Sequence, residues 1–389
     1  MSFHRETSCE TLIALLRATG DAERVLPGDD KWPEIINAAI RHRVMSLLAG
    51  ALRPIKHRLP PKVWAQVERH SLVAGARALY LARELARIYT MLEGQGIRIL
   101  AWRGVVAACD LHGRLDAREF DDIDLLVNPD DISRIRDCLE RDGYTWPLGL
   151  TPPQEQRYRH SVGEYIFWPA GREYQVEVNT GLGPRYFGWP VDFDLLWARR
   201  RTVVIEGAQI PTLAREDLLV FLCVHAAKHM WRRMQWVVDI AALVRDTRVM
   251  DRGRVMECAR RLDAEGVLAA GLQLAGELFG ARPQFAAPGA AGSKRSDMLY
   301  AVGRKQLLAG SDRPSSMREA LRYHQAMHDR WLEQMMLIVR MVVTPSVGDW
   351  YWTRLPARLF ALYYILRPVR LMTQWMGGRF RRPGPDVAQ

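Results

Sequence analysis

The sequence contains few cysteines, and they are not arranged in pairs. There are 5 cysteines among 389 residues, and no two of them form a C-x-x-C motif. They are Cys9, Cys109, Cys138, Cys223 and Cys258. An odd, scattered set argues against a disulfide framework and against a zinc ribbon. We therefore expect a protein that works in a reducing compartment, the cytoplasm.

Long hydrophobic runs are absent as well. No segment of the sequence reaches the roughly 20 apolar residues that a transmembrane helix requires. Residues 1–10 include His4, Arg5 and Glu6, where a secretory signal peptide has an unbroken apolar region. Both observations again favour a cytoplasmic protein.

Acidic residues are outnumbered by basic ones. The chain has 55 Lys and Arg against 44 Asp and Glu, which gives a formal net charge of +11. Such an excess favours partners that carry phosphate: nucleotides, nucleic acid or an anionic membrane surface. Nucleic acid is the least favoured of these, because no basic stripe interleaved with aromatic residues is present.

Hydrophobic periodicity predicts an α+β protein with helical regions around a small sheet. Apolar residues recur at helical spacing over 8–53 and more strongly over 61–93, before the turn Gly94-Gln95-Gly96. Short apolar or alternating runs predict strands at 97–101, 123–127, 164–168, 173–178, 202–205 and 209–211, with helices beginning at 104 and 129. Helical spacing returns at 215–230, 234–245, 252–264, 267–279 and 297–376.

The segment with the clearest chemical content is Asp122-Ile123-Asp124 at the start of an apolar strand. Side chains alternate between the two faces of a strand, so both carboxylates project from one face and Ile123 faces the core. Adjacent anions repel one another, and hard oxygen ligands on one face suit Mg²⁺ or Mn²⁺. The alternative is a strand that merely begins with solvated acids after a turn. Spacing alone does not separate these interpretations.

The order of further motifs points to a known family. Residues 97–143 resemble the core of the polymerase-β-like nucleotidyltransferase fold, and the chain is similar over about 95–280 to an uncharacterised bacterial nucleotidyltransferase family of that superfamily. The matching segments are Trp102-Arg103-Gly104, Arg118 with Asp122–Val127, Asp142-Gly143-Tyr144, Val176-Glu177-Val178-Asn179, Leu218–His229 and Trp231–Asp239.

The resemblance implies a fold and a reaction, and helical periodicity on either side of the core completes a division into four regions. The reaction would move a nucleoside monophosphate from an NTP to a hydroxyl or phosphate, with Mg²⁺ or Mn²⁺ held by Asp122, Asp124 and a third carboxylate, Glu177. Several family members accompany peptide natural-product or exopolysaccharide gene clusters. The acceptor is not identified by the sequence, and a modified peptide, a sugar phosphate, a small antibiotic-like molecule and a protein side chain all remain candidates. The regions expected are an N-terminal helical region, the catalytic core, a helical domain facing the cleft, and a C-terminal helical region with a basic tail (1–93, 94–213, 214–282 and 283–389).

Two departures from the superfamily pattern concern the proposed site. Arg103-Gly104 stands where Gly-Ser is usual, and Asn179 replaces the histidine of the family. A glycine lets backbone N–H groups approach phosphate, and Arg103 could hold a triphosphate although its planar fork differs from a lysine. These departures keep open the alternative of a catalytically weak nucleotide-binding or scaffold protein.

Other candidate phosphate ligands lie outside these motifs. Arg118 is either a phosphate clamp or the partner of Glu119 or Asp121 in a salt bridge. In the predicted helix at 215–230, Lys228 and His229 would meet phosphate, and Trp231 would stack on a base or sugar. His225 and His229 share a helix face, but the absence of the H-E-x-x-H glutamate disfavours a zinc site. We expect Asp239 to orient neighbouring Arg or His side chains.

The C-terminal segment 350–375 mixes Trp, Tyr, Leu and Arg. It would either lie on an anionic membrane surface, making the chain a membrane-surface or peptide-binding module, or pack across the core as a closing helical layer. Helical spacing of its aromatic residues favours packing.

Overall fold

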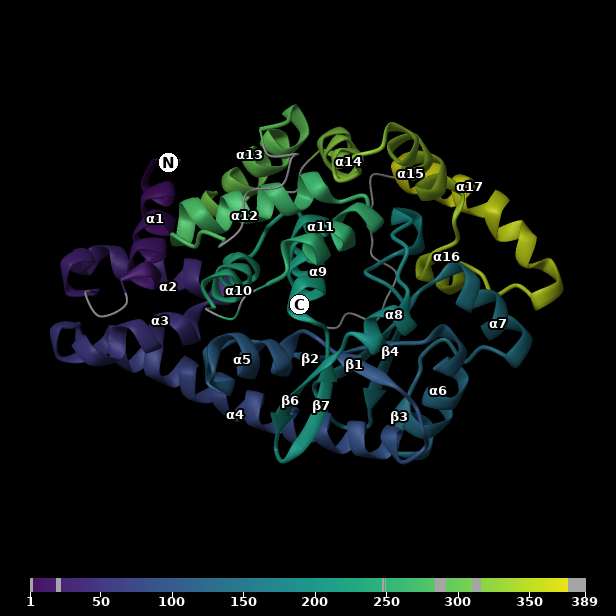
Figure 1. Cartoon of the computed structure of the whole chain (residues 1–389), viewed down its shortest axis with the longest axis horizontal. Coiled ribbons are helices and arrows are strands. Elements are labelled where there is room, and N and C mark those ends of the chain that lie inside the picture. Colours follow the sequence, from purple (N-terminus) through teal and green to yellow (C-terminus); the bar gives the residue numbers. More distant parts are fainter. Residues whose placement is uncertain are drawn as a thin grey trace.

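The computed structural model describes residues 3–18, 22–246, 248, 250–283, 292–309 and 316–376. At its centre is a mixed five-stranded sheet of order β1-β2-β5-β4-β3 (Figure 1). The strands are β1 (Ile99–Ala101), β2 (Asp122–Val127), β3 (Tyr144–Thr145), β4 (Glu164–Pro169) and β5 (Gln175–Asn179). Within the described ranges, none of the helices has the length and apolar character needed to cross a bilayer.

The pairing of β2 with β5 brings distant parts of the sequence together. These two strands are parallel, and Asp124 lies opposite Glu177 in their register. Strand β1 pairs antiparallel with the other side of β2, while β4 pairs antiparallel with β5. Strand β2 therefore has a neighbour on each side, which fits its apolar residues Ile123 and Leu125–Val127.

Each face of the sheet is covered by a different set of helices. Ile123, Leu125 and Val178 face a core formed with the C-terminal half of α4 (Pro61–Glu93), which runs along the sheet in Figure 1. Leu100 and Leu126, at the alternate positions, belong to a second core with α9 (Arg215–Lys228). The same alternation places the carboxylates of β2 on the α9 side.

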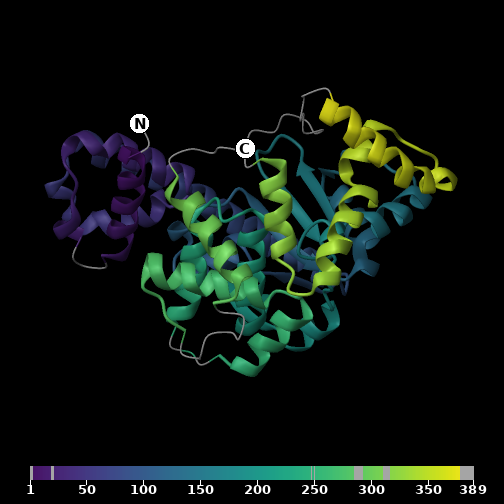
Figure 2. The same cartoon turned by 90° about the horizontal axis from the view of Figure 1, so that it is seen from above.

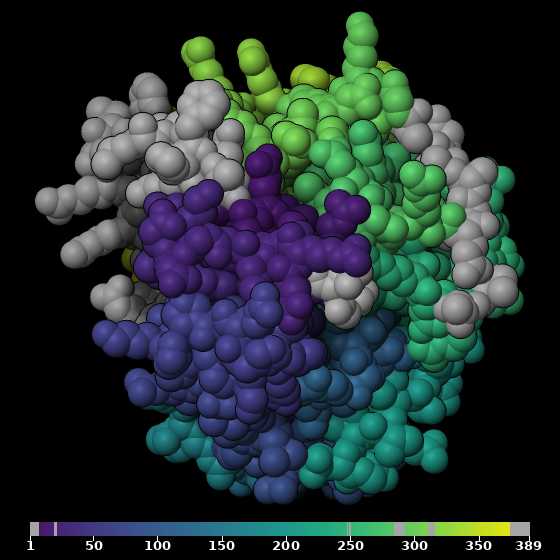
Figure 3. Space-filling view, turned by 90° about the vertical axis from the view of Figure 1, so that its left-hand side faces the viewer, coloured from purple at the N-terminus to yellow at the C-terminus, as the bar shows by residue number. Residues whose placement is uncertain are grey.

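Helices that precede and follow the sheet make up most of this second core. On the N-terminal side they are α1 (Phe3–Arg17), α2 (Trp32–Arg41) and α3 (Met45–Leu52). On the other side they are α9, α10 (Met234–Arg245), α11 (Arg252–Arg261), α12 (Glu265–Phe279) and α13 (Lys294–Leu308). Helix α1 packs against α12 and α13, so the two ends of this helical region meet (Figure 3).

The C-terminal helices extend from α13 toward the end of the molecule opposite α1, where the last of them lies (Figure 2). They are α14 (Met317–Ala326), α15 (Trp331–Val343), α16 (Val347–Trp352) and α17 (Tyr363–Met376). Trp350 and Tyr363 are fully buried, and Trp350 packs on Tyr158 of α7 (Pro152–Ser161). The expected packing of this segment is confirmed for these aromatic residues.

Most predicted helices and strands are confirmed, and the differences concern one hairpin and two helices. The strands at 202–205 and 209–211 form β6 (Arg201–Ile205) and β7 (Ala208–Thr212), a hairpin separate from the main sheet. Helix α7 and the short α8 (Phe193–Ala198) occur where no helix was expected. The Gly-, Ala- and Pro-rich composition of residues 283–296 predicts a linker, and residues 284–291 of this segment lie outside the described residues.

Candidate active site

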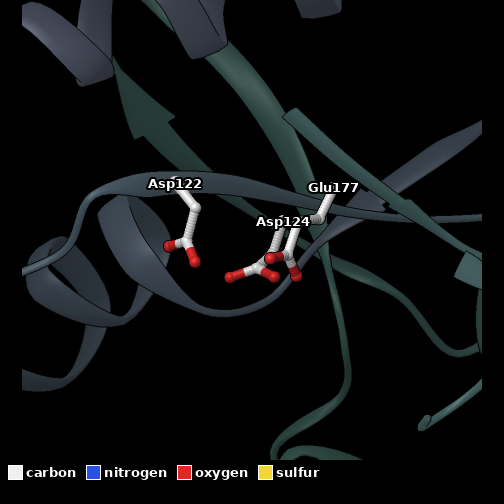
Figure 4. A group of neighbouring side chains, drawn as sticks. All are labelled: Asp122, Asp124 and Glu177. Carbon is white, nitrogen blue, oxygen red and sulfur yellow. The ribbon is translucent and has the colours of Figure 1, made fainter. Parts of the chain in front are cut away.

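Three carboxylates meet on the α9 side of the sheet. Asp122 and Asp124 come from β2 and Glu177 from β5, and they point toward one another in Figure 4. Each offers an oxygen that lies within 4.8 Å of the oxygens of the other two. This is the one group of potential metal ligands among the residues that the structure describes. We call Asp122, Asp124 and Glu177 the acidic triad.

Burial and mutual repulsion make the acidic triad a site that favours positive charge. Burial, followed by the neighbouring charge of Asp124, raises the pKa of Asp122 to about 6 against the opposing charge of Arg103. Burial also raises the pKa of Glu177 well above its ordinary value, with the Asp124 and Asp122 charges as the next causes. Such shifts arise when anions lack sufficient counter-charge. A divalent cation bound by these oxygens would supply that charge, and the ligand set fits Mg²⁺ or Mn²⁺.

Arg103 is the cation in direct contact with the acidic triad. Its Nη2 forms an ion pair with Asp124 and lies 3.6 Å from Oε2 of Glu177. Burial lowers the pKa of Arg103, but the charges of Asp124 and Glu177 outweigh burial and the pKa is raised overall. The guanidinium also lies over the ring of Trp102, 4.8 Å from its centroid. Arg103 thus neutralises part of the acidic triad.

His225 supports Arg103 from α9. Nη1 of Arg103 is 2.6 Å from Nδ1 of His225, so the guanidinium donates and the imidazole accepts. Burial, followed by the charge of Arg103, holds the pKa of His225 well below its ordinary value. The imidazole is therefore neutral. The hydrogen bond between His225 and Arg103 was not predicted, because helical spacing does not show which residues of other elements lie nearby.

Lys228 reaches toward the same region from the end of α9. Its Nζ donates to the carbonyl oxygen of Leu182 at 3.2 Å. A Cβ on Gly183 would lie 2.8 Å from Cδ of Lys228, so the glycine makes room for the lysine chain. Burial lowers the pKa of Lys228, and the Arg103 charge is the next cause. The site therefore has a second, partly buried cation beside Arg103.

Gly104 shapes the turn between β1 and α5 (Gly104–His112). Its φ is +52°, a left-handed conformation that favours glycine. A Cβ at this position would lie 3.4 Å from the carbonyl oxygen of Asp122. The turn therefore approaches the first residue of β2 closely, and it places the beginning of α5 beside the acidic triad.

Arg118 is engaged in a buried ion pair that was not expected. Its Nε donates to Oδ2 of Asp239 at 2.9 Å, while His112 Nε2 lies 2.8 Å from Oδ1 of the same carboxylate. The partners considered for Arg118, Glu119 and Asp121, are therefore wrong. The structure confirms that Asp239 orients an arginine and a histidine. Asp239 therefore holds the guanidinium of Arg118 in a fixed position, four residues before β2 begins.

The histidine and tryptophan at the end of α9 have different environments. His229 is exposed, and its ring centroid lies 4.9 Å from that of His225. Trp231 is fully buried, and a Cβ added at Gly303 would lie 2.8 Å from its ring. The expectation that Trp231 stacks on a base or sugar is therefore wrong, because no face of its indole is accessible.

The comparison with protein families agrees with this geometry. Residues 28–280 match a family described as "Uncharacterised nucleotidyltransferase". The chain belongs to this nucleotidyltransferase family. Its α+β fold, with a small mixed sheet between helical regions, and its acidic triad are consistent with that membership.

One solved structure is similar to part of this nucleotidyltransferase. It is the crystal structure of an antigenic nucleotidyltransferase-like protein from Paracoccidioides brasiliensis, which is 17% identical in sequence. The match covers 56% of this chain and 98% of that chain, with a TM-score of 0.36. No curated protein matches the sequence.

Proposed function

We propose that this protein transfers a nucleoside monophosphate from an NTP to a hydroxyl or phosphate of an acceptor. The observation that carries the proposal is the convergence of Asp122, Asp124 and Glu177 on one face of the sheet. In this reaction an acceptor oxygen bonds to the α-phosphorus, the bond to the β-phosphate oxygen breaks, and pyrophosphate leaves. A carboxylate of the acidic triad takes the proton of the acceptor.

The acidic triad would hold Mg²⁺ or Mn²⁺. Such an ion supplies neutralisation of the triphosphate charge and polarises the reacting phosphate. The protein's own part is to hold three oxygens close together on a rigid parallel strand pair. Preorganised charge of this kind is the main contribution that an enzyme makes to phosphoryl chemistry.

Basic groups around the acidic triad are suited to the triphosphate. Arg103 and Lys228 are partly buried cations, and His229 is exposed next to Lys228 in the chain. The backbone N–H groups that begin α5 at Gly104 add a site for phosphate oxygen. We propose that Arg103 exchanges its contact with Asp124 for a phosphate oxygen when metal and nucleotide bind.

Isothermal titration calorimetry with each NTP and Mg²⁺ tests the site. The Asp122→Asn/Asp124→Asn variant should lose metal-dependent nucleotide binding. Asp121→Asn is the matched control, because Asp121 adjoins the motif but is half exposed and pairs with Arg43 and Arg77. Equal binding by the double variant and wild type would reject the proposed metal ligands.

A second function is favoured by one observation, the ion pair between Arg103 and Asp124. If this pair persists with nucleotide bound, the protein would bind NTP without transferring it, as a sensor or scaffold. Pyrophosphate release measured with candidate peptide and sugar acceptors separates the two functions. Release above that of the double variant supports transfer. Tight binding with no release for any acceptor supports the second function.

A further inference from the structure

The exposed face of α15 is unusually apolar. Leu337 is the only buried residue of this helix. The exposed fraction is 70% for Trp331, 54% for Met335 and 51% for Val339. These positions are four apart, so they form a stripe along one side of the helix. Three further apolar residues are exposed, namely Leu332, Met336 and Val342.

Helix α17 is amphipathic in the opposite sense from a normal surface helix. Its buried face carries Arg367 and Arg370, whose guanidinium groups donate to Asp349 at 2.9 Å and 2.5 Å. Its outward face carries Ile365 and Met372, which are 64% and 62% exposed. Surface helices of proteins in water place charge outward and apolar side chains inward. This helix does the reverse.

The two helices form a single layer. Arg367 donates to the carbonyl oxygen of Met341 through both Nε and Nη2, at 2.9 Å and 2.7 Å, which fastens α17 to the end of α15. Figure 2 shows α15 and α17 together at the end of the molecule farthest from α1. Exposed apolar side chains gathered on one layer of a protein mark an interaction site. We call the exposed apolar residues of α15 and α17 the apolar layer.

The charge around the apolar layer indicates what covers it. Residues 350–373 contain no Asp, Glu or Lys but include Arg354, Arg358, Arg367 and Arg370. Arg367 and Arg370 are committed to Asp349, whereas Arg354 and Arg358 are exposed. A second copy of the chain would bring the same positive charge to a two-fold interface, where like charges repel. An anionic surface complements it.

We propose that the apolar layer docks this protein on an anionic lipid bilayer, with α15 and α17 lying in the interfacial plane. Apolar side chains enter the boundary between head groups and acyl chains, and arginines meet lipid phosphates. Trp331 and Trp352, 70% and 51% exposed, suit this boundary because indole is apolar with one polar N–H. The proposal does not depend on the reaction assigned to the acidic triad.

Vesicle co-sedimentation of the full chain tests the docking. The probes are vesicles of phosphatidylcholine alone and of phosphatidylcholine mixed with phosphatidylglycerol. We expect binding to the mixed vesicles that weakens with added salt. The variant Trp331→Gln/Met335→Gln/Ile365→Gln/Met372→Gln should lower the partition coefficient roughly a hundredfold, since it removes four apolar insertions. These side chains are more than half exposed, so the fold does not need them.

Leu72→Gln/Val73→Gln is the matched control. These α4 residues are 68% and 66% exposed but lie outside the apolar layer, so vesicle binding should not change. Thermal unfolding of each variant verifies that the fold is kept. Three results would overturn the proposal: no binding to the mixed vesicles, equal loss in both variants, or a dimer in light scattering that only the quadruple variant dissociates. The last result would assign the apolar layer to a second copy.

Discussion

Arg103 offers the most direct perturbation of the acidic triad. Arg103→Met removes the positive charge and keeps an unbranched side chain. Deleting one partner of a buried ion pair costs about 3–5 kcal/mol of folding free energy. Here the lower end applies, because the pKa of Asp122 is already about 6 with Arg103 present. Removing Arg103 takes away a charge that lowers this pKa, so a proton on Asp122 can replace part of the missing charge near pH 7. We expect a loss of about 3 kcal/mol without divalent metal.

Divalent metal should reverse most of this loss. A cation bound by the acidic triad replaces the missing charge of Arg103. A ligand at a hundred times its Kd stabilises the folded state by about 2.7 kcal/mol. Wild-type protein should gain less from the same concentration, because the metal competes with Arg103 for Asp124. The variant and the wild type therefore converge in stability as Mg²⁺ or Mn²⁺ is added.

Urea unfolding followed by tryptophan fluorescence, in EDTA and then in excess Mg²⁺, measures both effects. Arg114→Met is the matched control, because Arg114 pairs with Asp116 at 2.6 Å but is about half exposed. An exposed pair of this kind contributes at most about 1 kcal/mol and is independent of metal. The reasoning is refuted if Arg103→Met equals wild type in EDTA, or if its deficit is the same with and without metal.

Three further changes test the surroundings. Gly104→Ala should lower the free energy of unfolding in urea by about 1–2 kcal/mol, because an L side chain is strained at a φ of +52°. An unchanged free energy of unfolding would mean that the turn relaxes without strain. Asp239→Asn should cost about 3–5 kcal/mol by calorimetry, because it leaves the buried guanidinium of Arg118 without its anion; a loss below 1 kcal/mol, as at surface pairs, would contradict this. Burial opposes the ionisation of Asp349, but hydrogen bonds led by the one from Arg370 outweigh burial and lower the pKa of this carboxyl. The ionised carboxylate therefore stabilises the fold above about pH 4, and this stabilisation is lost as the pH falls further. Asp349→Asn should therefore be less stable at neutral pH and depend less on pH between about 5 and 2, and a parallel dependence would contradict the assignment.

The sequence predicted those parts of the site that follow from local periodicity. Alternation along β2 placed Asp122 and Asp124 on one face, and the structure confirms it. The strand that bears Glu177 was also predicted, but only the family resemblance brought it next to β2. Asp124 and Glu177 are 53 positions apart in the chain. Their pairing depends on how the intervening helices and strands pack, which no local sequence pattern predicts.

The partners of charged side chains were harder to predict for the same reason. Arg118 bonds to Asp239, 121 residues away, although acids adjoin it in sequence. Arg103 meets Asp124 and His225 because β1, β2 and α9 converge. Trp231 follows a helix of candidate ligands and still faces inward, where the glycines of α12 and α13 leave room for its ring. These outcomes follow from tertiary packing, which overrides what neighbours in sequence suggest.

The central sheet separates the protein into two hydrophobic cores, and the active site lies at their boundary. The strands that carry the acidic triad rest on the core shared with α4, whereas His225 and Lys228 stand on α9, within the other core. Strands β1 and β2 also contribute Leu100 and Leu126 to the α9 core, so one sheet joins the two cores. The spacing between the anionic and cationic halves of the site is therefore set by the packing of α9 on the sheet.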